Sequence, residues 1–213
     1  MKGLILKDFL LFWKNAKMIL IVYLVGIAMS FFTDSASFLI MFITLFSIMW
    51  IINLFGLDLQ AKWEPYCAGL PVPRRKIVLA RYLFFLLLVL VGTLLALADG
   101  LLIAAKNGWI MDDVIQKATE ALMISGGCLI FMSLLLPFVY KFGINKARFI
   151  VAAVAVLPAI FVSILGNQGD ISSILPSIEK FLSSLYWILP TAGAVLYSIS
   201  YLISGSIYLK KEL

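Results

Sequence analysis

The sequence predicts an all-α, polytopic membrane protein with six transmembrane helices, an N-terminal amphipathic helix at the membrane surface, and both termini in the cytoplasm. Of its 213 residues, 63% are hydrophobic and 13% are charged, whereas roughly a quarter of the residues in a soluble domain are charged. The charges fall in short islands between apolar runs, and each run is long enough for a helix to cross about 30 Å of hydrocarbon. Lys and Arg concentrate on one side of the resulting topology, as the positive-inside rule requires.

Six apolar runs, each bounded by charges or turn residues, define the expected spans. They cover residues 17–32, 38–57, 77–98, 121–140, 149–166 and 185–209. Arg81 lies one turn into the third run, where its long stem can return the charge to the interface, and Asp99 follows that run as an expected loop cap or solvated carboxylate. Because no internal repeat or separate soluble region is present, residues 1–213 are treated as one transmembrane domain.

An even number of spans places both termini on one side, and the positive-inside rule assigns that side to the cytoplasm. All but three of the 17 Lys and Arg residues then face the cytoplasm, the exceptions being Lys106, Lys117 and Lys180. The net charge of +6 therefore reports topology in a cytoplasmic membrane. The basic residues are spread over several loops and are not gathered with exposed aromatic residues, so the expected surroundings are the lipid bilayer and no nucleic acid.

The composition also excludes several enzyme classes. The chain has no histidine, which is the commonest metal ligand and general base, so zinc proteases and Ser-His-Asp hydrolases are excluded. A Gly-x-Ser-x-Gly elbow and a clustered acidic metal motif are also missing. We therefore expect no catalytic residue and no metal site. Cys67 and Cys128 lie too far apart to predict a structural disulfide, and charges within residues 1–15 argue against a removable signal peptide.

The first 15 residues have the pattern of an amphipathic helix that lies at the membrane surface. A helical wheel of residues 2–15 gathers the large apolar side chains on one face and places Lys7 and Asp8 on the other. Leu4 and Leu11 fall within the polar face, where lipid cannot cover them. Exposed leucines among charges favour docking against a soluble partner, while the overall pattern is equally typical of a simple membrane anchor.

The second charged island, DLQAKWEPYCAGLPVPRRKIVLAR at residues 58–81, is longer than a simple turn. Pro65, Pro71 and Pro73 prevent one continuous helix. The island is therefore expected to form a short helix near 61–69, a rigid turn at 70–73 and a basic collar that begins with Arg74 and Arg75. Taken alone, it also fits a plain loop whose basic residues set the topology.

The N-terminal KGLILKDFLLFWKN, followed by one hairpin and then KWEPYCAGLPVPRRKIVLARYL, resembles the small type-2 permeases of bacterial ATP-binding-cassette (ABC) exporters. The order of elements agrees along the whole chain, and the specific part of the resemblance covers residues 62–82. Members of this class include permeases of bacitracin and lantibiotic resistance systems and of the exporter for phenol-soluble modulins, which is the nearest resemblance.

This resemblance implies that the N-terminal helix and the cytoplasmic loop at 58–76 contact a separate ATPase chain, which would bind ATP and Mg. The chain itself would hold no cofactor, and its lack of any Gly-Lys dipeptide excludes a phosphate loop of the Gly-x-x-x-x-Gly-Lys-Ser/Thr type. The family also implies a second permease, in a homo- or heterodimer. The residues expected to couple to the ATPase are Leu4, Lys7, Asp8, Leu11, Lys62, Trp63, Glu64, Tyr66, Arg74 and Arg75.

Polar residues inside the apolar runs are candidates for lining a substrate path. They are Thr44, Ser47, Asn53, Ser125, Ser133, Thr191 and Ser198. Since they do not share one helix face, bonds from their hydroxyls to their own backbone are an alternative explanation. Two further patterns are open as well: residues 125–127 form either a hinge or a close helix contact, and a tyrosine stripe at Tyr197, Tyr201 and Tyr208 either meets substrate or packs.

The function that these features favour is outward transport of hydrophobic or amphipathic molecules, above all peptides, with a separate ATPase as the motor. One alternative is a permease-like subunit for sensing of, or immunity to, antimicrobial peptides. An ion-coupled transporter is a further alternative, although it would be expected to carry ionisable groups deep in its spans. This sequence keeps almost all of its charges at the edges of the apolar runs.

Overall fold

The computed structural model describes residues 2–33, 37–69, 72–108, 111–147, 149 and 188–210. Every regular element within these ranges is helical, which confirms the all-α class. The elements are α1 (Lys2–Lys14), α2 (Ala16–Thr33), α3 (Ser37–Gln60), α4 (Trp63–Ala68), α5 (Arg74–Lys106), α6 (Met111–Phe142) and α9 (Ile188–Lys210). The predicted amphipathic helix corresponds to α1 and the predicted short helix of the loop to α4. The predicted fifth span at 149–166 lies, apart from residue 149, outside the described residues.

Among the residues that the structure describes, three segments are long and apolar enough to cross a membrane: Arg74–Lys106, Val114–Phe142 and Ile188–Lys210. They include the predicted third and fourth spans and residues 188–209 of the predicted sixth. At 1.5 Å per residue the 33-residue α5 is about 50 Å long. The helices α2 and α3 coincide with the first two predicted runs. That these two helices also cross the membrane, and that the spans number six, stay predictions.

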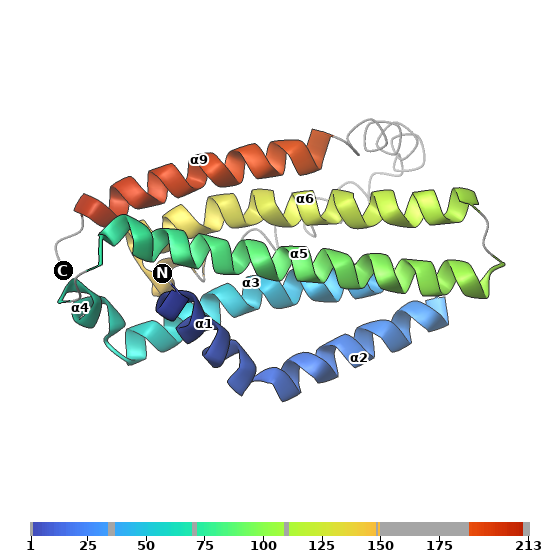
Figure 1. Ribbon diagram of the computed structural model, residues 1–213, viewed down its shortest axis with the longest axis horizontal. Coiled ribbons are helices and arrows are strands. Elements are labelled where there is room, and N and C mark those ends of the chain that lie inside the picture. The colour runs from blue at the N-terminus through green and yellow to red at the C-terminus, as the bar shows by residue number, and fades with distance from the viewer. Residues whose placement is uncertain are drawn as a thin grey trace, which may run out of the picture.

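The helices α3, α5, α6 and α9 run side by side along the long axis of the molecule, and α2 lies against them at an incline (Figure 1). The short helices α1 and α4 gather at one end, together with the first turn of α5 and the last turn of α9 (Figure 1). We call this end of the bundle the α4 end.

Helices α6 and α9 approach each other closely at a pair of glycines. A Cβ atom added at Gly126 would lie 2.6 Å from the backbone N of Pro190, and one added at Gly193 would lie 2.7 Å from the backbone O of Gly126. Any larger residue at either position would separate the two backbones. Of the two interpretations of residues 125–127, the structure supports the close helix contact.

A cluster of buried hydroxyl groups joins α5, α6 and α9. The Tyr82 hydroxyl lies 2.8 Å from Ser200 Oγ and 2.7 Å from Ser204 Oγ. Ser200 donates to the Ser133 carbonyl at 2.6 Å, and the Tyr197 hydroxyl donates to the Tyr82 carbonyl at 2.8 Å. Tyr197 is buried, so this part of the tyrosine stripe packs within the chain.

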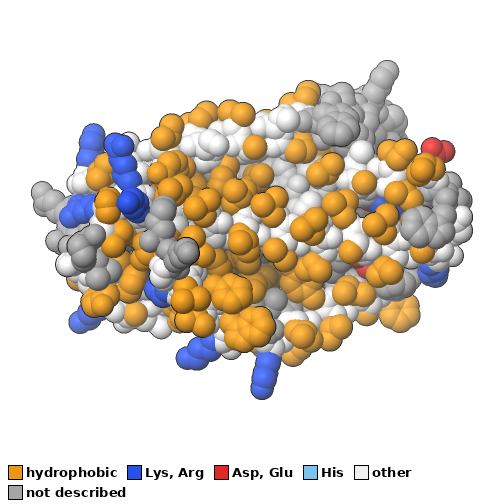
Figure 2. All heavy atoms as spheres, in the orientation of Figure 1, with side chains coloured by type: hydrophobic (Ala, Val, Ile, Leu, Met, Phe, Trp, Pro, Cys, Tyr) orange, Lys and Arg blue, Asp and Glu red, His pale blue; other side chains and the backbone are white. Residues whose placement is uncertain are grey.

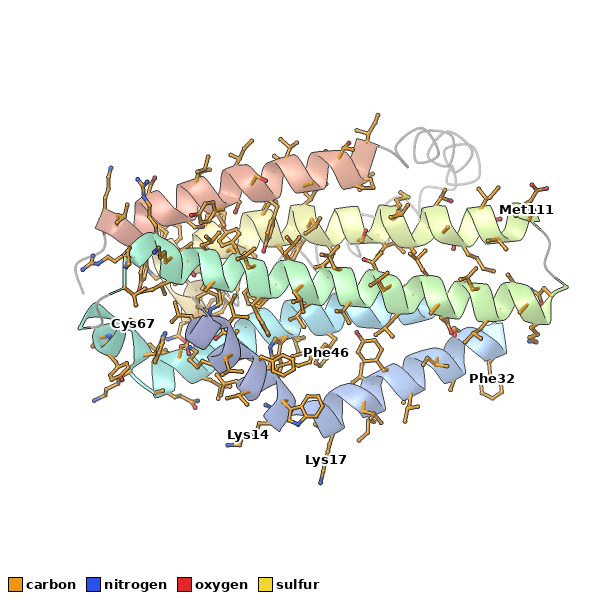
Figure 3. The ribbon with its side chains drawn as sticks, in the orientation of Figure 1. Lys14, Lys17, Phe32, Phe46, Cys67 and Met111 are labelled. Carbon is orange, nitrogen blue, oxygen red and sulfur yellow. The ribbon has the colours of Figure 1, made fainter. Side chains whose placement is uncertain are left out.

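The surface agrees with a chain that is solvated mainly by lipid. Hydrophobic side chains cover most of the face shown in Figure 2, whereas Lys and Arg gather mainly at the α4 end and along the edge formed by the α1–α2 junction. At that junction Lys14 and Lys17 project away from the bundle, and Phe32 near the other end of α2 is 85% exposed (Figure 3). A surface this apolar would be unfavourable in water and is favourable in hydrocarbon.

One expectation about the far end of the bundle is corrected. Asp99 does not cap a loop in solvent, because α5 continues to Lys106 and leaves the Asp99 side chain buried, with the residue 3% exposed. Helix α6 likewise begins at Met111, ten residues before the apolar run of the predicted fourth span. Both helices extend beyond their apolar runs, since helix propensity does not end where hydrophobicity does.

Candidate functional site

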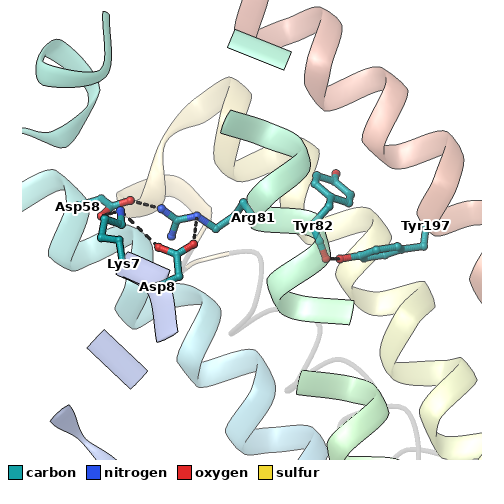
Figure 4. A network of polar contacts seen from close by, with 6 residues as sticks. All are labelled: Lys7, Asp8, Asp58, Arg81, Tyr82 and Tyr197. Carbon is teal, nitrogen blue, oxygen red and sulfur yellow. Dashed lines mark hydrogen bonds and ion pairs between the residues drawn. The ribbon is translucent and has the colours of Figure 1, made fainter. Parts of the chain in front are cut away.

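Four charged side chains from three parts of the sequence meet at the α4 end: Lys7 and Asp8 of α1, Asp58 near the end of α3, and Arg81 of α5 (Figure 4). We call them the ion network. Lys7 Nζ lies 2.8 Å from Asp58 Oδ1 and 3.3 Å from Asp8 Oδ1. Arg81 Nε lies 3.3 Å from Asp8 Oδ2, and Arg81 Nη2 donates to Asp58 Oδ2. Each carboxylate therefore interacts with both cations.

Three of the four residues of the ion network are buried and Lys7 is partly exposed, which makes the charge balance of the network important. Asp8 is 2% exposed, Arg81 6% and Asp58 9%. A buried charge is strongly unfavourable without a partner, but here two cations face two anions. Burial raises the pKa of the Asp8 carboxyl, although the positive charges of Arg81 and Lys7 oppose the rise. Desolvation thus outweighs ion pairing at Asp8.

Aromatic rings extend the ion network towards α4. Lys7 Nζ lies 4.0 Å from the centre of the Trp63 ring, a cation–π contact between α1 and α4. The Trp63 ring in turn lies 5.4 Å from the Tyr66 ring, centre to centre, and Tyr66 is 63% exposed. Between α3 and α4, Lys62 has a left-handed backbone with φ 49°. This sharp turn redirects the chain so that α4 can reach α1.

Helix α1 turns its charged face inwards, towards the bundle. Leu11 and Phe12 pack against the hydrophobic core, and the Phe12 ring lies 5.2 Å from the Trp50 ring, centre to centre. Leu10 and Trp13, by contrast, are 57% and 66% exposed. The expectation of an exposed Leu11 is therefore wrong. A helical wheel of α1 alone cannot show that Asp58 and Arg81 of other helices lie against its charged face. Leu4 is partly buried, and Asp8, expected on a polar outer face, is buried.

A pocket of about 320 Å³ lies directly beside the ion network. Arg81 and Asp58 form part of its lining, and Lys62 and Trp63 contribute from the turn and from α4. Apolar side chains complete the walls; they include Phe55, Ile77, Val139, Tyr140 and Ile144. The pocket is thus a mainly apolar cavity with charged groups in its lining.

The predicted coupling residues that the structure describes all lie at the α4 end. Lys62 and Arg75 are exposed, as is Tyr66, while Trp63 is partly buried. Arg74 Nη1 donates to the Leu209 carbonyl of α9 at 3.4 Å. Glu64 belongs to α4, but its side chain lies outside what the structure describes.

Sequence reasoning missed the partnership of Asp58 and Arg81. A signal was present in the sequence, because Arg81 stands inside an apolar run where a lone charge is costly. A buried cation of this kind is stabilised by a nearby buried anion. Asp58 and Asp8 each lie at the edge of an apolar stretch and were therefore candidates for that partner. The snorkelling expectation for Arg81 is wrong, since its guanidinium pairs inside the protein.

The candidate path residues do not assemble into one lining. Their hydroxyls bond to their own helices: Ser125 to the Leu122 carbonyl, Ser133 to Ile130, Thr191 to Ile188 and Ser198 to Ala194. Asn53 is exposed, and the side chains of Thr44 and Ser47 lie outside the described residues. Backbone bonding, the alternative explanation, accounts for the four hydroxyls that the structure describes.

Comparison with known proteins identifies the family. Residues 3–209 match the model of a family described as ABC-2 family transporter protein. No match was found among curated proteins or among solved structures. The match thus supports the permease resemblance at the level of the family, and it does not extend to the resemblance with the exporter for phenol-soluble modulins. Because it covers nearly the whole chain, the protein belongs to the ABC-2 family of membrane transporter permeases, which lack ATPase activity of their own and function with an ABC ATPase.

Proposed function

We propose that this chain is the transmembrane subunit of a bacterial ABC exporter that moves hydrophobic or amphipathic molecules outward, such as phenol-soluble modulins or antimicrobial peptides. A separate cytoplasmic ATPase would bind at the α4 end and supply ATP hydrolysis. The observation that carries the proposal is the ion network, because it joins α1, the end of α3 and α5 at the place where α4 presents an exposed surface.

The ion network offers a mechanical connection from α4 to a spanning helix. Trp63 of α4 makes a cation–π contact with Lys7. Lys7 forms an ion pair with Asp58, and Asp58 forms another with Arg81 of α5. Separating buried ion pairs is costly, since each charge would lose its partner without gaining water. Movement of α4 under the ATPase would therefore be passed to α1 and α5, and a rigid helix of about 50 Å would carry it through the membrane.

The distribution of charge supports a cytoplasmic location for the α4 end. Lys and Arg gather there (Figure 2), and such residues are retained on the cytoplasmic side of a membrane. The proposed orientation places both termini in the cytoplasm and the loop that contains α4 within reach of a soluble ATPase.

We place the substrate path between two permease copies. Within the described residues, bulky side chains including Trp50, Phe84, Phe85 and Met132 fill the space between α3, α5 and α6, and the candidate hydroxyls are occupied by their own backbone. The outer faces of the helices are strongly apolar. A path along the interface of a homo- or heterodimer would have an apolar lining, which suits amphipathic cargo.

Co-purification with the cognate ATPase tests the docking surface. Tyr66→Ala removes an exposed aromatic anchor and is expected to weaken ATPase binding about thirtyfold, since loss of such an anchor costs ~2 kcal/mol. Phe142→Ala is the matched control, because Phe142 is 43% exposed at the same end but belongs to α6. Equal ATPase binding by the Tyr66→Ala variant and the unmodified chain would remove the docking assignment.

Transport of a fluorescent amphipathic peptide into inverted vesicles tests the connection. Lys7→Met breaks the contacts to Asp58 and Trp63 and is expected to leave ATPase binding in place but to reduce peptide transport per ATP hydrolysed. Lys14→Met removes an exposed lysine of the same helix as a control. A Lys7→Met variant that transports peptide with unchanged coupling would show that the ion network carries no force.

A further inference from the structure

We propose that the pocket beside the ion network binds the phosphate of an anionic phospholipid from the cytoplasmic leaflet. This assignment does not depend on the transported substrate. It starts from Arg81, whose Nη1 is buried and has no hydrogen-bond partner among the described residues. Arg81 is 6% exposed and forms part of the pocket lining. A guanidinium group carries five N–H donors, and an unpaired buried donor is costly, so Arg81 has a donor without an acceptor in a residue that lines the pocket.

The charges around the pocket favour an anion as that acceptor. Asp58 turns one oxygen to Lys7 and the other to Arg81, so its negative charge is already compensated. Asp8 pairs with the same two cations. Lys62 adds a further positive charge at the rim of the pocket, which leaves the surroundings net positive. A phosphate oxygen can accept from Arg81 Nη1, and Lys62 can contact the headgroup from outside.

The shape and the position of the pocket favour a lipid over a soluble phosphate compound. Its volume of about 320 Å³ is near the lower limit of ligand sites, which start at roughly 300 Å³, and it exceeds the needs of one phosphate. Apolar side chains such as Ile77 and Val139 make up the remaining walls, and these suit the glycerol and the upper acyl carbons. The rim lies at the basic end of the bundle, where basic pockets between membrane helices hold anionic headgroups.

The test is native mass spectrometry of the full-length protein released from nanodiscs that contain equal amounts of phosphatidylglycerol and phosphatidylcholine. The unmodified chain is expected to retain phosphatidylglycerol about tenfold over phosphatidylcholine. Lys62→Glu, a change at an exposed side chain, is expected to lower the retained phosphatidylglycerol about tenfold. Lys14→Glu makes the same charge change on α1, away from the pocket, and is expected to leave retention unchanged. Inorganic phosphate in the release buffer is expected to compete with the lipid.

A second variant addresses the buried donor. Arg81→Lys preserves a cation for Asp8 and Asp58 but removes the guanidinium fork, and its helical content is checked by circular dichroism before the lipid is measured. Loss of lipid from a folded Arg81→Lys variant supports the site. Equal retention in Lys62→Glu and the unmodified chain, or equal loss in Lys14→Glu, would overturn the proposal by showing only annular lipid. Retention of inorganic phosphate with no retained phospholipid would overturn the lipid assignment. Because no ATPase takes part, these results are independent of the proposed transport.

Discussion

Replacing Arg81 by Gln removes the cation that two buried carboxylates share. In the native protein Arg81 contacts Asp8 through Nε and Asp58 through Nη2, and all three residues are at most 9% exposed. After the replacement, only Lys7 remains to balance two negative charges. Removal of one partner from a buried ion pair typically costs about 3–5 kcal/mol. For a chain of this size such a loss corresponds to a decrease in Tm of roughly 6–20 °C.

The loss can be measured by following the helical circular dichroism of the full-length protein in detergent micelles during thermal unfolding. Arg75→Gln is the matched control, because Arg75 lies on the same helix but is exposed. Its replacement is expected to change the free energy of unfolding by less than about 1 kcal/mol, as for exposed charges in general. The double variant Arg81→Gln/Asp8→Asn is expected to recover at least about 1 kcal/mol, because neutral Asn removes the surplus negative charge.

The reasoning would be refuted by either of two results. One is an Arg81→Gln variant that unfolds at the same temperature as Arg75→Gln, which would mean that the ion network contributes nothing to stability. The other is a double variant no more stable than Arg81→Gln alone, which would mean that the cost does not come from uncompensated charge.

Two further predictions concern Asp8 and the glycine contact. Because burial raises the pKa of Asp8 in the folded protein, the folded state takes up a proton at higher pH than the unfolded chain, and this contribution to stability grows as the pH falls through the folded pKa. Arg81, Lys7 and Asp58, the charged groups that face Asp8, are kept in both proteins. As the pH is lowered from about 7 to about 4, the Tm of Asp8→Asn is therefore expected to fall relative to that of the unmodified chain. A Tm difference that does not change with pH would contradict a raised pKa of Asp8. Gly126→Ala is expected to cost about 1–3 kcal/mol, since its Cβ would lie 2.6 Å from a backbone atom of α9, whereas Gly205→Ala, with nothing within 4 Å, is expected to be neutral or slightly stabilising in the same thermal assay.

Much of the helical architecture could be predicted from hydrophobicity and charge alone. The apolar runs at 77–98, 121–140 and 185–209 lie within α5, α6 and α9 apart from the first residues of the last run, and prolines marked the short α4. These features are local: a helix that spans lipid satisfies its own backbone hydrogen bonds, so the length and composition of a single segment suffice to predict it. The ends of the helices were less predictable, because α5 and α6 extend beyond their apolar runs.

The candidate site was predicted only as a region. The proline-containing island and the amphipathic start pointed to the α4 end, but the wheel of α1 showed Asp8 and Leu11 on an outer face. The structure turns that face inwards, because Asp58 and Arg81 supply partners from two other helices. Which side of an amphipathic helix is buried depends on what its neighbours offer, and that information is not local.

What the sequence by itself determined is the membrane class, the positions of the apolar helices and the end of the molecule at which charges collect. Each of these follows from the cost of placing polar groups in hydrocarbon, which every segment bears separately. Only the tertiary structure decided that Lys7, Asp8, Asp58 and Arg81 form one buried ion network beside a pocket. Its members are up to 74 positions apart, and charges separated so far along the chain become partners only when helix packing brings them within a few ångströms.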